Sequence, residues 1–159
     1  MVGETMPDLE KIKKEVMKEL EYNQKTKNVN IIYVCCCGSQ IYGYANEDSD
    51  YDIYFVYKKS LEEYISCFSS KKNTITFNSA DGKYQFMGYD IKKWLFLHYK
   101  SNPSVFEMTH STMILQDYPD FKSLPDFNLT PLYHHYMGMF HSNYKRVKIG
   151  KAINCLRNT

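Results

Sequence analysis

Apolar positions follow a helical period at the start of the chain and a strand period after it. Between charged residues they recur every three or four positions, as in an amphipathic helix, at Leu9, Ile12, Val16 and Leu20. The apolar run Ile31–Cys37 is too short for a helix of its own and predicts a buried strand. A second strand is predicted over Tyr51–Tyr57. Its alternation places Ile53 and Phe55 on one face and Asp52 on the other.

Turn and capping residues mark the short helices around these strands. Gly38-Ser39 breaks the first apolar run and precedes a brief helix predicted over Gln40–Ala45. Ser60 and Glu63 form a capping-box pattern for another helix, which we expect to run to about Phe68. A polar connector, Asn23–Asn30, separates the first helix from the first strand.

A β-hairpin is predicted in the middle of the chain. Its arms are Asn73–Asn78 and Lys83–Tyr89, joined through Asp81-Gly82, and the second arm ends at Asp90. We expect this second arm to lie beside the strand over Tyr51–Tyr57.

The remainder of the sequence favours helices. A helical period begins at Ile91 and stops before Asn102-Pro103, where the proline can begin another short helix. Thr130-Pro131 resembles an N-cap and first helical residue for a long helix through Tyr144. The order of elements therefore predicts an α+β fold with a small sheet, flanking helices and a helical C-terminal half.

Composition indicates a single domain with a hydrophobic core and a basic C-terminal segment. The chain has 159 residues, 43% hydrophobic and 24% charged, as in ordinary globular domains. Its net charge of +2 is too small to indicate a partner. However, no acidic residue occurs from Phe127 to Thr159, and Lys145, Lys148 and Lys151 make this segment a candidate polyanion surface.

Cysteine usage and hydropathy predict an intracellular, cytoplasmic protein. Three of the five cysteines are adjacent in the first strand, which favours reduced thiols as small apolar residues over disulfides or a zinc site. No segment approaches the length of a membrane span, and the N-terminus lacks the apolar core of a signal peptide.

Carboxylates are concentrated where the predicted strands begin or end. Asp50 and Asp52 are two positions apart and share one strand face, so their mutual repulsion favours a bound cation. If the two strands pair and the hairpin lies beside them, we expect Asp90 to converge with them at one sheet edge. Oxygen ligands alone favour Mg²⁺ or Mn²⁺. The amides of Gly38-Ser39 would face a phosphate, which predicts phosphoryl or nucleotidyl transfer.

Each of these motifs alone has an ordinary structural explanation. Asp48–Asp52 by itself is more often a solvated turn before a strand, and a Gly-Ser after a strand is more often only a turn. Their order and spacing are the informative part, because a strand, Gly-Ser, about ten residues and then Asp-Tyr-Asp-Ile is an unusual combination.

These motifs resemble the DNA polymerase β-type nucleotidyltransferase superfamily. The signature is Gly38-Ser39, Tyr42-Gly43 and Asp48-Ser49-Asp50-Tyr51-Asp52-Ile53. Further matches are Asp90-Ile91-Lys92-Lys93, Lys100-Ser101-Asn102-Pro103, Glu107, His135-Tyr136 and Ser142-Asn143-Tyr144. With these, the chain is most similar to the bacterial and phage predicted nucleotidyltransferases associated with RNA ligases and RNA repair.

The resemblance implies a small mixed or antiparallel nucleotidyltransferase sheet and a role for each matching residue. Gly38 and Ser39 would hold a nucleoside triphosphate, while Asp50 and Asp52 would bind the metal ions. Asp90 would be the third catalytic carboxylate, acting as a metal ligand or base near the attacking hydroxyl. Candidates for phosphate, nucleotide or RNA contacts are Lys92, Lys93, Lys145, Lys148 and Lys151, although a solvated helix face is the more frequent explanation for such lysines.

The resemblance also implies a domain division and a longer chain. We expect residues 1–126 to form the catalytic core and residues 127–159 a basic helical segment. Family members continue beyond the region that matches Arg157. We therefore expect either a minimal or truncated version, or a second polypeptide that supplies the rest.

The resulting hypothesis is a metal-dependent nucleotidyltransferase. It would move a nucleoside monophosphate from a nucleoside triphosphate to a hydroxyl, most often of RNA, and release pyrophosphate. Two alternatives stay open at this point. One is a minimal enzyme of the toxin–antitoxin type that modifies a protein partner, and the other is a non-catalytic nucleotide- or RNA-binding domain.

Overall fold

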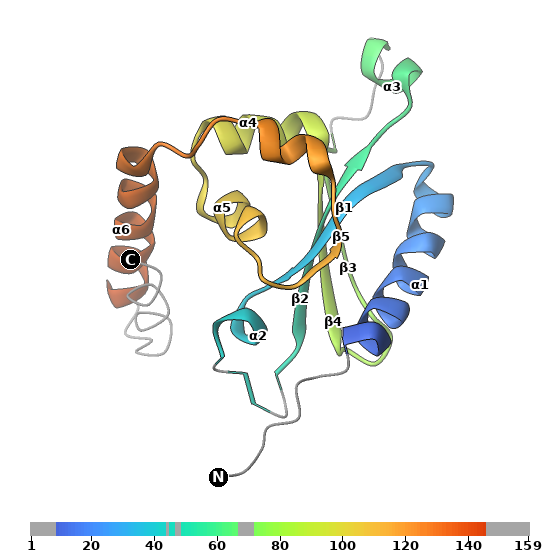
Figure 1. Cartoon of the computed structure of the whole chain (residues 1–159), viewed down its shortest axis with the longest axis horizontal. Coiled ribbons are helices and arrows are strands. Elements are labelled where there is room, and N and C mark those ends of the chain that lie inside the picture. The colour runs from blue at the N-terminus through green and yellow to red at the C-terminus, as the bar shows by residue number, and fades with distance from the viewer. Residues whose placement is uncertain (1–8, 44, 47–48, 67–71, 146–159) are drawn as a thin grey trace. The chain divides into compact units, whose positions relative to one another are not determined.

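The computed structural model describes residues 9–43, 45–46, 49–66 and 72–145 (Figure 1). Its elements, in chain order, are α1 (Leu9–Lys27), β1 (Asn30–Cys37), α2 (Ser39–Tyr42), β2 (Tyr51–Lys58), α3 (Leu61–Ile65), β3 (Thr74–Asn78), β4 (Tyr84–Asp90), α4 (Ile91–Tyr99), α5 (Pro103–Thr109), β5 (Ile114–Gln116), the 3-10 helix η1 (Pro119–Ser123) and α6 (Leu129–Lys145). This is the α+β fold predicted from the sequence, with a C-terminal half that is largely helical apart from β5.

Two compact units divide these elements. One comprises Met1–Ile91 with Ser111–Pro119 and therefore contains the whole sheet, and the other comprises Lys92–His110 with Asp120–Thr159. The predicted boundary at residue 126 divides a catalytic core from a basic helical segment, and it stays a prediction. Among the described residues, no helix is long and apolar enough to cross a membrane.

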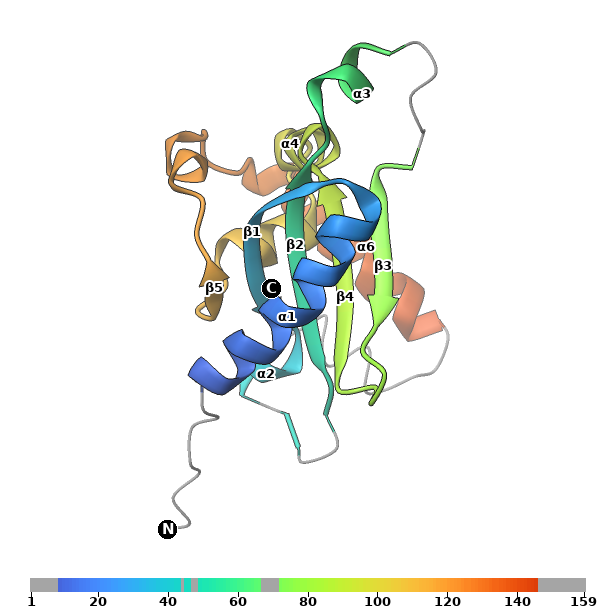
Figure 2. The same ribbon diagram turned by 90° about the vertical axis from the view of Figure 1, so that its right-hand side faces the viewer.

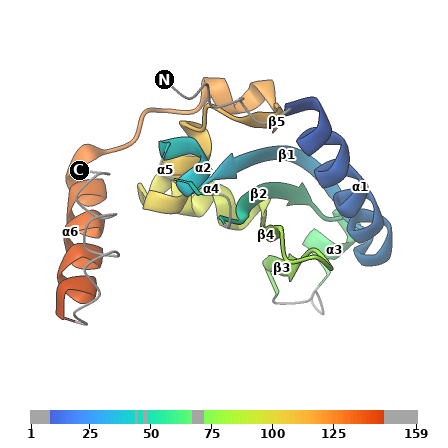
Figure 3. The same cartoon turned by 90° about the horizontal axis from the view of Figure 1, so that it is seen from below.

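The sheet has five strands in the order β3-β4-β2-β1-β5 (Figure 3). β1 runs antiparallel to both β2 and β5, and the β3–β4 hairpin is antiparallel as expected. The second arm of the hairpin does lie beside β2, but the two strands are parallel. The direction of β4 decides where the predicted site residues lie.

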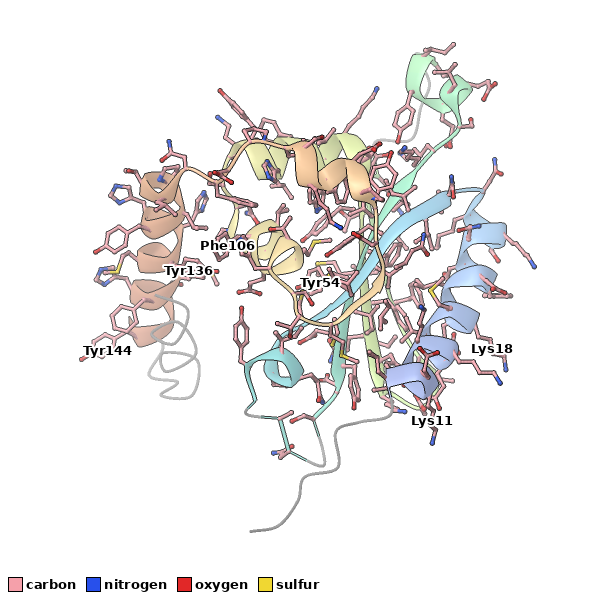
Figure 4. The ribbon with its side chains drawn as sticks, viewed as in Figure 1. Lys11, Lys18, Tyr54, Phe106, Tyr136 and Tyr144 are labelled. Atoms are coloured by element: carbon pink, nitrogen blue, oxygen red, sulfur yellow. The ribbon has the colours of Figure 1, made fainter. Side chains whose placement is uncertain are left out.

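Helix α1 covers one face of this sheet (Figure 2). Its buried residues Ile12, Val16 and Leu20 join the core cluster of the sheet, as their spacing predicted. Each such side chain contributes about 1.5–3 kcal/mol of hydrophobic stabilisation when fully buried. Lys11 and Lys18 extend from the outer side of the helix (Figure 4).

Alternation divides the strand residues between the two faces of the sheet. Phe55 belongs to the core cluster, and the absence of a side chain at its β4 neighbour Gly88 leaves room for the ring, since a Cβ there would collide with it. Tyr54 (Figure 4) and Asp52 occupy the alternate positions of β2, and strand alternation places both on the face away from α1. The core cluster that includes α1 is therefore on one face, and the predicted chemistry is on the other.

The first helix is longer than expected, and the connector after it is shorter. α1 continues to Lys27, although Asn23–Asn30 was predicted to be a polar connector. Gln24 explains how the helix joins β1, because its main-chain carbonyl accepts a hydrogen bond from Val29 N (3.1 Å) and its side-chain oxygen accepts one from Ile31 N (3.0 Å). The last residues of α1 are polar, so the hydrophobic pattern ended before the helix did.

Aromatic rings and caps organise the helical unit. Trp94 stacks on Phe121 with ring centroids 4.0 Å apart, and the rings of His98 and Phe127 are 4.3 Å apart. Asn102 caps α5 by accepting from Ser104 N (3.0 Å), next to the predicted Pro103 start.

Helix α6 begins slightly earlier than predicted. The side chain of Asn128 accepts from Thr130 N (3.1 Å), so the cap lies before the Thr130-Pro131 pair, and α6 begins at Leu129. On the inner side of the helix, Tyr136 Oη lies 3.5 Å from Glu107 Oε1 of α5 (Figure 4).

Candidate active site

The turn from β1 into α2 is the first part of the site. Gly38 has φ +74° and ψ −150°, a backbone conformation that is favourable only for glycine. A Cβ at this position would collide with the carboxylate of Asp52. The predicted Gly38-Ser39 turn and the carboxylate pair therefore lie against each other, although Gly38 is 14 positions before Asp52 in the sequence.

The loop before β2 positions the carboxylates. Ser49 N donates to Asn46 O (3.0 Å), while Ser49 Oγ donates to Asn46 Oδ1 (2.8 Å). The Gln40 side chain of α2 donates to Ser49 O (3.3 Å), so the helix and the loop are joined immediately before Asp50. This framework fixes the backbone from which both carboxylates extend.

Electrostatics at Asp52 favour a bound cation. Partial burial and, second, the negative charge of Asp50 raise the pKa of the Asp52 carboxyl above its ordinary value of 3.8. A cation between the two carboxylates would offset both effects. The carboxylate pair fits Mg²⁺ or Mn²⁺, which prefer oxygen ligands, and the Gly38 turn lies directly against this pair.

Asp90 does not join this pair, and the expectation that three carboxylates converge is wrong. In the parallel β2–β4 register, Asp90 is the partner of Tyr57, five positions beyond Asp52 and thus about 16 Å along the strand. Asp90 is buried, with 1% of its surface exposed. It accepts a hydrogen bond from Tyr64 Oη (3.0 Å) and lies 3.9 Å from Lys59 Nζ. Asp90 therefore has structural partners at the opposite end of the strands.

Gln85 lies where the sequence analysis expected a third carboxylate. It is the β4 partner of Asp52, and its Nε2 donates to Asp50 Oδ2. Among the described residues, no three His, Cys, Asp or Glu side chains are placed to hold one metal ion. Sequence reasoning missed Gln85, although it is the exposed second residue of an otherwise largely buried strand. That exposed polar position was the available signal.

The predicted lysines are placed outside the sheet unit or outside the described residues. Lys92 and Lys93 are in the first turn of α4, in the helical unit. Lys145 is the last residue of α6, and Lys148 and Lys151 lie outside the described residues. Nucleotide contacts of Lys92 and Lys93 and RNA contacts of the other three stay predictions.

The cysteines beside the site are unsuited to nucleophilic chemistry. Cys35, Cys36 and Cys37 are buried thiols outside any disulfide, as the sequence predicted for reduced apolar residues. Cys37 is the β1 partner of Asp52. Burial is the main reason why the pKa of the Cys36 thiol rises to about 12, so this thiol is protonated at neutral pH.

Comparison with known proteins identifies a relative and a family for this chain. One similar protein is the uncharacterized protein YcgL of Bacillus subtilis (strain 168), with 28% identity over 103 residues. The alignment covers 65% of this chain but only 39% of YcgL, so the chain spans well under half of that relative.

The family comparison covers nearly the whole sequence. Residues 12–156 match the RlaP family, described as the RNA repair pathway DNA polymerase beta family. The match includes the Gly38 turn, both carboxylates, Gln85 and the helical unit. The chain is thus a member of this RNA-repair family of polymerase β-like nucleotidyltransferases.

Proposed function

We propose that the chain transfers a nucleoside monophosphate from a nucleoside triphosphate to a hydroxyl of RNA in a Mg²⁺- or Mn²⁺-dependent reaction. The hydroxyl oxygen forms a bond to the α-phosphorus, the bond from that phosphorus to the β-phosphate oxygen breaks, and pyrophosphate and a proton are released. The contact between the Gly38 turn and the carboxylate pair is the observation that carries this proposal.

The chain's own residues would hold and orient the triphosphate. Asp50 and Asp52 would hold the divalent cation, which when bound neutralises phosphate charge and aligns the reacting oxygens. Gly38 presents backbone without a side chain, so phosphate can approach the turn closely. The hydrogen bond that Ser49 accepts from Gln40 and the one that it donates to Asn46 would hold the backbone before Asp50 in place while substrates exchange.

An exposed aromatic and basic surface on α4 supports RNA as the acceptor. Tyr99 is 79% exposed and Phe96 is 58% exposed. Lys100 Nζ lies 5.5 Å from the Tyr99 ring centroid and 5.8 Å from that of Phe96. Unpaired bases stack on such rings while a nearby ammonium group attracts the phosphate backbone.

A cytoplasmic location is part of the proposal. Buried thiols outside any disulfide fit the reducing conditions of the cytoplasm.

Label transfer tests the reaction. The protein would be incubated with each α-labelled nucleoside triphosphate, Mg²⁺ and either tRNA or a single-stranded RNA oligonucleotide. We expect label on RNA, and we expect Asp50→Asn and Asp52→Asn to reduce it by about a hundredfold or more, because each removes a cation ligand. Asp120→Asn makes the same change at an exposed position in the 3-10 helix and should leave transfer unchanged.

Two outcomes would overturn the proposal. If no label is transferred to RNA or to any added acceptor, the enzyme proposal fails. If label appears on a protein of the cell lysate and not on RNA, the acceptor is a protein side chain, and the RNA part of the proposal is wrong.

A second candidate is a non-catalytic nucleotide- or RNA-binding domain. The observation that favours it is the amide of Gln85 next to Asp50, where a third carboxylate was expected. Isothermal titration with ATP separates the two candidates. An enzyme that uses Asp50 and Asp52 requires Mg²⁺ for tight ATP binding, whereas binding that is indifferent to Mg²⁺ supports the non-catalytic domain.

A further inference from the structure

The face of the sheet away from α1 carries a row of side chains from four neighbouring strands. The register pairs Asn78 with Gln85, Gln85 with Asp52, and Asp52 with Cys37. Residues directly paired between adjacent strands extend to the same face. Gln85 is therefore the immediate neighbour of the carboxylate pair on its β4 side.

The hydrogen bond from Gln85 to Asp50 gives this neighbour a defined role. Gln85 Nε2 donates to Asp50 Oδ2 across the two strands. The bond orients the carboxylate of Asp50. This residue lies immediately before β2, so the strand ladder itself does not hold it. Because Gln85 is exposed, its side chain is also accessible to a cation or a phosphate.

We infer that Gln85 is the third member of the cation site and that it limits the charge of this site to that of two carboxylates. This inference rests on the proposed function, since it assumes a divalent cation at Asp50 and Asp52. Gln85 is a positioning residue for Asp50, and its amide offers a neutral oxygen where a third carboxylate would add a full negative charge.

The charge has a direct consequence for binding. Two carboxylates neutralise a single divalent cation, and a hard cation completes its oxygen coordination with water or substrate phosphates. The free protein therefore holds the cation weakly, and the nucleoside triphosphate supplies the remaining negative charge. Replacing the amide of Gln85 by a carboxylate should make the cation site strong even without nucleotide.

Mn²⁺ binding without nucleotide is the test, followed by electron paramagnetic resonance or calorimetry. We expect Gln85→Glu to bind Mn²⁺ about tenfold or more tightly than wild type, because the new charge lies beside the cation. Asn78→Asp is the matched control, since it adds the same charge on the same face one strand farther from Asp52. Its affinity should stay within about threefold of wild type because solvent screens the longer distance.

Thermal unfolding supplies a second readout. Without a cation, Gln85→Glu should lower the melting temperature, because a carboxylate then faces Asp50, and saturating Mn²⁺ should reverse this loss. If Gln85→Glu does not fold, Gln85→Ala serves instead. Loss of the hydrogen bond to Asp50 should then weaken Mn²⁺ binding by about threefold or more.

The outcomes separate this inference from the proposed function. Equal Mn²⁺ affinities of Gln85→Glu and Asn78→Asp, or an unchanged affinity of Gln85→Ala, would overturn the inference alone, provided that Asp52→Asn abolishes binding. Mn²⁺ binding that survives Asp52→Asn would show that the cation is not held at the carboxylate pair. That result would overturn the metal site of the proposed function together with the inference.

Discussion

At the scale of single residues, the site depends on one position that tolerates no side chain. Gly38 combines a backbone conformation available essentially to glycine with direct proximity to Asp52. Two separate physical costs therefore oppose any substitution there. The first is backbone strain, and the second is the displacement of a carboxylate that the proposed reaction requires.

Gly38→Ala should lower both stability and activity. Backbone strain of this kind costs about 1–3 kcal/mol, and the collision with Asp52 adds to it. Gly43→Ala is the control, because Gly43 also has positive φ (+70°) in the same turn region, but its Cβ position has no neighbour within 4 Å among the described residues beyond those next to it in the chain. Urea unfolding of both variants measures the difference. Equal losses of stability would mean that contact with Asp52 is unimportant.

At the scale of elements, the direction of β4 separates Asp90 from the other carboxylates. The buried Asp90 lies at the Tyr57 end of β2, and it connects β4 to Tyr64 of α3 and to Lys59, the residue after β2. Its sequence neighbourhood, Asp90-Ile91-Lys92-Lys93, is therefore informative about family membership without showing that Asp90 binds metal.

Asp90→Asn should destabilise the fold and leave Mn²⁺ affinity unchanged. Weakening a buried charged hydrogen-bond network costs about 1–3 kcal/mol. Tyr64→Phe removes the hydroxyl that donates to Asp90 and accepts from Lys59 N (3.1 Å), but it keeps the Asp90 carboxylate, so it should have a smaller effect in the same direction. Chemical denaturation and Mn²⁺ titration test both variants. Loss of Mn²⁺ binding in a stable Asp90→Asn protein would contradict this assignment.

Helix α4 supplies the second prediction at this scale. Tyr99→Ala should weaken binding of single-stranded RNA by about tenfold, because stacking of one base on an aromatic ring contributes about 1–3 kcal/mol. The control is Tyr22→Ala, an equally accessible tyrosine on α1 that is 70% exposed. Fluorescence anisotropy with a labelled oligonucleotide measures both. Similar effects of the two variants would argue against an RNA surface on α4.

At the scale of the whole molecule, the helical unit contains a tryptophan reporter that the sheet unit lacks. The sheet unit is rich in tyrosine, whereas the chain's single tryptophan, Trp94, belongs to the helical unit. Trp94 lies 5.5 Å from the ring of His98, so its fluorescence follows unfolding where that histidine is buried. Tryptophan fluorescence therefore reports on the helical unit.

Acid should destabilise the helical unit through His98. Burial lowers the pKa of His98 below its ordinary value of 6.5, so the unfolded chain binds this proton more readily than the folded chain. Stability is therefore lost as the pH falls below about 6.5. Urea unfolding monitored by Trp94 fluorescence between pH 7.5 and 5 should show this loss, and His98→Phe should reduce it. An unchanged pH dependence in that variant would assign the effect to another group.

Hydrophobic patterns and caps were sufficient to predict most helices and strands, because these elements depend on residues that are near each other in sequence. The spacing of Ile12, Val16 and Leu20 predicted α1 and its buried face, and the Ser60 cap of α3 is confirmed by its bond from Glu63 N (3.3 Å). The short edge strand β5 gave only a weak signal, since three residues carry little periodicity.

The sequence by itself determined the α+β class, the family and the close pair Asp50 and Asp52, because all three follow from local order and from the period of a strand. Only the tertiary structure decided which residue lies beside that pair. A hairpin pattern leaves open whether its inner arm runs parallel or antiparallel to the next strand. The parallel direction of β4 placed Gln85 at the carboxylates and carried Asp90 to the far end, because five residues of strand separate their partner positions on β2.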